Sequence, residues 1–267
     1  MSTETWAVAA PQTIDVEGVT GATVRLQGGR AEMVTDPAAT TTRVEVLEVG
    51  ARPLQVVREG DRLRVGYDRT WVDAVRSRLS NLTQTERAVV RVVVPPGSAV
   101  DVGTIDADVE VTGGRAVAVR TVTGSVRTHG TTGPLALRAV SGDLTAAGHT
   151  GDVSASVVSG ALSLDGALAR VSVTAASGAT SITAAAGTSP MVNARTVSGT
   201  LDVRLAPGTP VNLKVRGASG QVVVDGSVVP SSGTTLVVDH AEQASGGEPA
   251  AYLSATVTSA RVTVDRR

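Results

Sequence analysis

Apolar and polar residues alternate along most of this chain, and a short tripeptide punctuates the alternation. A small apolar residue, a hydroxyl residue and Gly recur at a spacing of 18 or 21 positions from one glycine to the next, at Val122-Thr123-Gly124, Val140-Ser141-Gly142, Val158-Ser159-Gly160, Ala176-Ser177-Gly178, Val197-Ser198-Gly199 and Ala218-Ser219-Gly220. Degenerate copies with Ala in the last position bracket this series, at Ile105-Asp106-Ala107 and Thr258-Ser259-Ala260. Such a fixed period predicts a repeat architecture.

Four apolar columns accompany the tripeptide. In the copy around Gly160, they are Val153 and Ala155 before the glycine and Leu162 and Leu164 after it. The period of two predicts strands with one buried face, so each copy holds two short strands joined at the Ser-Gly corner. A repeat of this size buries its core only by stacking on its neighbours. The pattern predicts an all-β fold, namely a parallel β-helix-like solenoid of about eight short coils of 17–21 residues.

The Gly and hydroxyl columns have a structural interpretation. A sharp corner favours positive φ or very close packing, and Gly tolerates both. The Ser or Thr before it can satisfy backbone groups at the corner with a ladder of hydroxyls.

The remaining segments define the predicted domain organisation. We expect an N-terminal tail at 1–12, a β-rich cap at 13–96, and the repeat region at 97–267 with a polar loop near 241–250. Thr70-Trp71-Val72-Asp73 resembles a capping box and predicts a short amphipathic helix near 71–80. Trp71 and Leu79 on its apolar face either pack on the β core or contact a partner.

Composition narrows the classes of function. The 267 residues carry a formal net charge of −1 with both signs interspersed, which disfavours nucleic acid as a partner. There is no Cys and no Phe, so thiol chemistry is excluded and the interior is expected to be thin. No apolar stretch is long enough to span a bilayer and the first residues do not resemble a signal peptide. We expect a cytoplasmic protein, whose association with the cell envelope would run through a partner.

The tandem T-V-S-G-x-L/V-x-V array that follows Pro95-Pro96-Gly97 resembles the bacterial β-strand-repeat family labelled "putative adhesin". That family is related to the toastrack domains of envelope-stress systems. The resemblance covers roughly residues 13–264 and implies a mainly parallel, β-helix-like fold. It supplies no catalytic or ligand residues, and in membrane-anchored relatives it implies an interaction role at the envelope.

Candidate catalytic and metal-binding chemistry is sparse. Asp106, Asp108 and Glu110 form the best acidic cluster, with Asp101 nearby, but the later copies do not extend it into an acidic groove. The histidines at 129 and 149 fall near corners, where we interpret them as exposed residues rather than as zinc ligands. We predict no enzymatic activity, no cofactor and no metal.

A basic column is the more specific candidate for a binding surface. It contains Arg120, Arg138, Arg195 and Arg216, and Ser156 and Thr174 lie between the two pairs. The repeat predicts that Arg120 is stacked on Arg138 one coil apart, and Arg195 on Arg216 in the same way. Such a pair either spreads into solvent or holds an acidic partner group.

The function that these observations favour is a non-enzymatic interaction or scaffold protein, with an unknown protein partner or with self-association. The alternative is a self-assembling filament protein similar to the bactofilins. A carbohydrate-binding or carbohydrate-active β-helix protein is less favoured.

Overall fold

The computed structural model describes residues 3–67, 86–231, 235–242 and 250–266. It divides into two compact units, Met1–Thr132 and Gly133–Arg267, which are described separately below. The described residues of both units are strands, turns and loops without any helix, so the fold is all-β.

Two long parallel strands organise the first unit. Its strands are β1 Thr3–Val8, β2 Gln12–Val16, β3 Gly21–Thr35, β4 Thr42–Val49, β5 Leu54–Glu59, β6 Arg62–Gly66, β7 Arg87–Val94, β8 Ala99–Thr112, β9 Arg115–Thr123 and β10 Val126–His129. β3 and β8 pair in parallel along nearly their whole length. The first half of β3 also pairs with β6 and its second half with β7, while β8 pairs with β9 and then β10. Antiparallel strands complete the unit: β4 pairs with β7 and β2, and β5 with β6 and β1.

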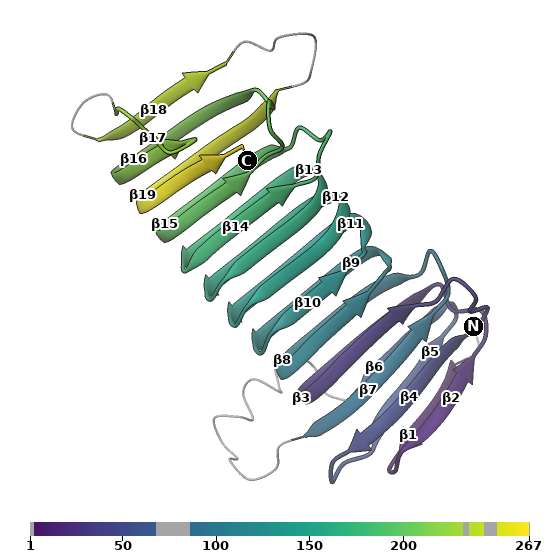
Figure 1. Ribbon diagram of the computed structural model, residues 1–267. Helices are drawn as coiled ribbons and strands as arrows, with labels where there is room; N and C mark the ends of the chain where they lie inside the picture. The colour runs from purple at the N-terminus through teal and green to yellow at the C-terminus, as the bar shows by residue number, and fades with distance from the viewer. Residues whose placement is uncertain (1–2, 68–85, 232–234, 243–249, 267) are drawn as a thin grey trace. The chain divides into compact units, whose positions relative to one another are not determined.

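Five long parallel strands form the centre of the second unit. Its strands are β11 Thr132–Ser141, β12 Leu144–Ser159, β13 Leu162–Ser177, β14 Ala179–Ala184, β15 Met191–Arg204, β16 Val211–Val224, β17 Ser227–Val229, β18 Leu236–Ala241 and β19 Ala251–Asp265. The parallel order is β12, β13, β15, β19, β16. The short strand β14 lies between the first half of β13 and the second half of β15, and it pairs in parallel with both. β17 and β18 both pair antiparallel with β16. Figure 1 shows the yellow β19 between β15 and β16.

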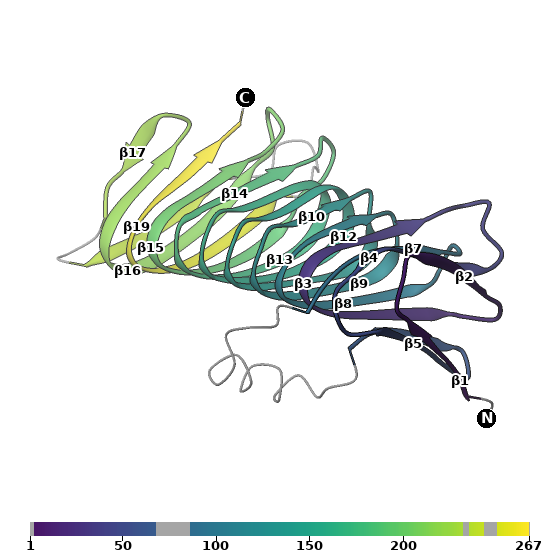
Figure 2. The ribbon, with the colours of Figure 1, turned by 90° about the horizontal axis from the view of Figure 1, so that it is seen from below.

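The long strands bend, so that their two halves enclose a core (Figure 2). In β15, Val192 and Ala194 are buried before the Ser198-Gly199 step, and Leu201 and Val203 are buried after it. Every member of the four apolar columns is buried in the same way, so this prediction from the period of two is confirmed. The largest fully buried side chains are Met33, Ile182 and several leucines, which is what a core without Phe can supply.

The prediction of a parallel β-helix-like solenoid of about eight short coils is wrong. The copies do not divide into two short strands at each corner, because β15, β16 and β19 continue through it without a break. The order of strands in space also departs from the order in sequence, since β19 is inserted between β15 and β16. The repeat pattern reports which face of a strand is buried, but it carries no information about which strand becomes the neighbour. The predicted short helix near 71–80 lies outside the described residues.

The corner prediction itself is confirmed. Gly160 has φ +139°, and a Cβ placed on it would lie 2.2 Å from the carbonyl oxygen of Gly142. Both positive φ and close packing therefore require Gly at this position. The hydroxyl ladder is also present, since Oγ of Ser177 donates to the carbonyl oxygen of Val158 at 3.2 Å, and Oγ of Ser198 to that of Ala176 at 3.3 Å.

Candidate functional site

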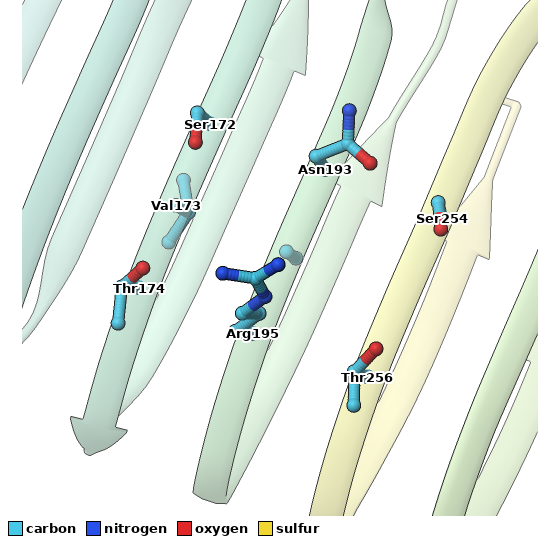
Figure 3. A pocket seen from close by; sticks show the side chains of 8 residues that line it. Ser172, Val173, Thr174, Asn193, Arg195, Ser254 and Thr256 are labelled. Carbon is cyan, nitrogen blue, oxygen red and sulfur yellow. The ribbon is translucent and has the colours of Figure 1, made fainter.

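A polar groove of about 410 Å³ lies on the outer face of β13, β15 and β19. Its lining residues are Ser172, Val173, Thr174, Asn193, Ala194, Arg195, Ser254 and Thr256, and we call it the Arg195 groove. Figure 3 shows the hydroxyl, amide and guanidinium groups arranged on three adjacent strands. The groove belongs entirely to the second unit.

Strand alternation and register place these side chains together. On β15, Val192 and Ala194 point into the core, so Asn193 and Arg195 are exposed on the outer face. The parallel register sets Ser172 and Thr174 opposite them on β13, and Ser254 and Thr256 opposite them on β19. Asn193 thus lies between two serines, while Arg195 lies between two threonines.

Arg195 has no ion-pair partner within the part of the chain that the structure describes. Two further cations, Lys214 and Arg216 on β16, extend the same face, and neither of them has an ion pair among the described residues. One carboxylate, that of Asp239 on β18, is opposite Lys214 in the antiparallel register. The surface is therefore basic beside a set of neutral hydroxyl and amide groups.

The prediction that Arg195 and Arg216 are stacked on adjacent strands is wrong. Thr256 of β19 is the register partner of both arginines, so one full strand separates them. Two strand spacings correspond to about 9.6 Å, which weakens the repulsion between the two guanidinium groups. In the sequence, β19 follows β16, and only the fold shows that it is inserted between β15 and β16.

The other predicted partner residues do not join this groove. Arg120 in the first unit lies within 3.5 Å of a carboxylate oxygen of Asp101, which also binds Arg25 at 2.6 Å. Arg138 is exposed on β11 of the second unit, so its predicted stacking with Arg120 would join two units and stays a prediction. Trp71 and Leu79 lie outside the described residues.

The acidic cluster is engaged in structural contacts. Asp108 accepts a hydrogen bond from the backbone N–H of Ser125 at 2.9 Å, and Glu110 forms an ion pair with Arg30 at 2.6 Å. Asp106 accepts a hydrogen bond from Oγ1 of Thr123 at 3.0 Å. The same use of Asp recurs in the second unit, where Asp143 accepts from the backbone N–H of Ala161 at 2.9 Å.

The histidines differ from the sequence interpretation at one position. His129 is exposed on β10, as expected, but His149 on β12 is completely buried. Within the described ranges, no three His, Cys, Asp or Glu residues are grouped in a way that could hold a metal ion.

Sequence reasoning found Arg195 but missed most of its surroundings. Thr174 stands directly before Arg195 in the same column of the repeat, and Asn193 could have been found as the outward position two residues before Arg195. Ser254 and Thr256 could not have been found, because the order of the copies in the sequence places β19 beside β16 alone, whereas in the structure β19 also pairs with β15. Tyr252 also lies on this face of β19, paired in register with Met191, and both side chains are exposed.

Comparison with known proteins gives no family for this chain. No family model matches it, and no curated protein matches it. Among solved structures, the chain is similar to "a putative cell adhesion protein" from Clostridium sporogenes, with 10% identity, TM-score 0.31, and coverage of 97% of this chain and 100% of the other. It is also similar to "a putative adhesin" from Bacteroides fragilis, with 9% identity, TM-score 0.43, and coverage of 99% and 97%. A "putative lipid binding protein" from Parabacteroides distasonis gives 10% identity, TM-score 0.42 and coverage of 98% of each chain.

The described residues include no helix that is long and apolar enough to cross a membrane.

Proposed function

We propose that this chain is a non-enzymatic interaction protein whose binding surface is the Arg195 groove. The observation that carries the proposal is an exposed guanidinium without an ion pair among the described residues, surrounded by polar side chains on three adjacent strands. A charged group at a concave polar surface can form charge-assisted hydrogen bonds with a partner at little cost in rearrangement.

The carboxylates support a binding protein rather than a hydrolase. Paired carboxylates act in glycoside hydrolysis only when both face the same substrate. Here Asp108 accepts a backbone hydrogen bond and Glu110 is paired with Arg30, so both contribute to the fold. The relation to adhesin-like and toastrack proteins that the sequence resemblance implies remains part of this proposal.

Affinity capture with a charge-reversed variant tests the proposal. The full chain is immobilised and exposed to an extract of the native organism, and retained molecules are compared between wild type and Arg195→Glu. The matched control is Arg261→Glu, which reverses an exposed charge on the other half of β19, away from the groove. We expect a ligand that wild type and Arg261→Glu retain and that Arg195→Glu loses. Equal retention by all three proteins would refute the groove as the binding surface.

A further inference from the structure

The outer face of the second unit carries a regular grid of side chains that extends beyond the groove. β15, β19 and β16 present Asn193 and Arg195, Ser254 and Thr256, and Lys214 and Arg216 in register. Cationic strands therefore alternate with a strand of hydroxyls. Arg195 and Arg216 are separated by about 9.6 Å across the strands, which is twice the spacing between neighbouring strands.

An apolar platform adjoins this grid. Tyr252 and Met191 are register partners, and each lies two residues before Ser254 or Asn193, at the preceding outward position of its strand. Their side chains are 42% and 49% exposed, respectively. Exposed aromatic side chains with a polar end are typical of binding surfaces, because the ring supplies contact area at low cost in conformational entropy. Tyr252 thus adds an apolar contact beside the charged and hydroxyl groups.

We propose that this face binds an acidic oligosaccharide, which would lie across the strands. The proposal rests on the proposed function and specifies its ligand. Carboxylate groups of the saccharide pair with Arg195 and Arg216, its hydroxyls exchange hydrogen bonds with Asn193, Ser254 and Thr256, and one sugar ring packs on Tyr252. Arg is suited to carboxylates because its planar group donates two parallel hydrogen bonds.

The chemistry of the face favours a saccharide over an acidic peptide. A peptide that adds to a sheet pairs with unpaired backbone groups at an edge strand. The backbone of β15 and β19 is already paired on both sides, so this face can recognise a ligand only through side chains. Hydroxyl and amide groups both donate and accept hydrogen bonds, which suits a ligand that is itself rich in hydroxyls. A nucleic acid requires a continuous basic surface. Here the hydroxyl residues of β19 separate the cations of β15 from those of β16, and the carboxylate of Asp239 lies opposite Lys214.

Titration calorimetry with defined probes tests the ligand class. The probes are a galacturonic acid oligosaccharide, its methyl ester, which keeps the hydroxyls and loses the charge, and a polyglutamate peptide of similar length. We expect wild type to bind the acidic oligosaccharide, and the ester and the peptide at least about tenfold more weakly. Arg195→Gln combined with Arg216→Gln should weaken binding of the acidic oligosaccharide by at least about tenfold, and Tyr252→Ala by several-fold. Arg261→Gln should leave the affinity unchanged.

Failure of this proposal is separable from failure of the proposed function. Absence of binding to the acidic oligosaccharide, or equal binding of polyglutamate, would overturn the saccharide assignment. If the capture experiment still shows a ligand that depends on Arg195, the groove remains a binding surface for a different partner. The assignment would also be overturned if the Arg195→Gln, Arg216→Gln variant bound the oligosaccharide as well as wild type does. A urea unfolding midpoint equal to that of wild type would show that this variant is folded.

Discussion

Arg195 and Arg216 occupy the same column of the second unit without being neighbours, because β19 places Thr256 between them. The arrangement spaces two like charges across a neutral strand. It also explains how both arginines can lie on this face without an ion pair among the described residues.

This insertion predicts the effect of a third arginine. Thr256→Arg would place a third arginine on the strand between Arg195 and Arg216, about 4.8 Å from the strand of each, and should lower the free energy of unfolding by about 1 kcal/mol at low ionic strength. The loss should shrink in high salt, because the charges are exposed. Thr263→Arg on the other half of β19 is the matched control, since its register partner on β15 is Asp202. Urea unfolding at two salt concentrations measures both, and equal effects of the two substitutions would contradict the strand order.

Arg266 closes the end of the second unit through two carboxylates. Its Nε donates to Oδ2 of Asp225 at 2.8 Å, and its guanidinium also donates to Glu242 and to the carbonyl oxygen of Thr209. Arg266→Ala should lower the free energy of unfolding by about 1–2 kcal/mol, a value reduced for the partial exposure of the carboxylates. Urea unfolding measures this loss. Arg261→Ala removes an exposed arginine that has no ion pair among the described residues and should have almost no effect.

The same cluster predicts a dependence on pH. Hydrogen bonding from Arg266 lowers the pKa of Asp225 below its ordinary value of 3.8. Burial raises the pKa of Glu242, but hydrogen bonds from Arg266, His240 and the backbone of Val211 outweigh burial, so the pKa lies below 4.5. Because both folded-state pKa values are depressed, the stabilisation is complete above about pH 5 and is lost as the pH falls through them.

The difference in unfolding free energy between wild type and Arg266→Ala should therefore shrink between pH 6 and pH 3. Urea unfolding at a series of pH values measures this difference. A difference that stays constant over the range would show that the carboxylates do not carry the effect.

The corner glycines predict that adding a Cβ at a crowded corner lowers the free energy of unfolding. Gly160→Ala places a methyl group 2.2 Å from the Gly142 carbonyl oxygen at φ +139°, and should cost about 2–4 kcal/mol. Gly187→Ala is the milder comparison, because φ is +76° there, near the left-handed α region, and nothing lies within 4 Å of the added Cβ. It should cost about 1 kcal/mol, the price of the left-handed backbone alone. Similar losses at both positions in urea unfolding would contradict the larger cost predicted for the crowded corner at Gly160.

The sequence alone determined the local architecture of this protein. Its period of two identified the buried columns, such as Val192, Ala194, Leu201 and Val203 in β15, because alternation in a strand assigns every second side chain to the core. The Gly and Ser columns were likewise predictable, since a close corner excludes Cβ and leaves backbone carbonyls to be satisfied. Arg195 could be named as an outward cation for the same reason.

Only the tertiary structure decided how the strands are assembled. Backbone hydrogen bonds are chemically identical along every strand, so the repeat does not specify that β19 pairs with both β15 and β16. That pairing brings Ser254 and Thr256 to Arg195 and separates it from Arg216. The Arg195 groove is therefore a consequence of strand order, which depends on the sum of many distant contacts and not on any local pattern.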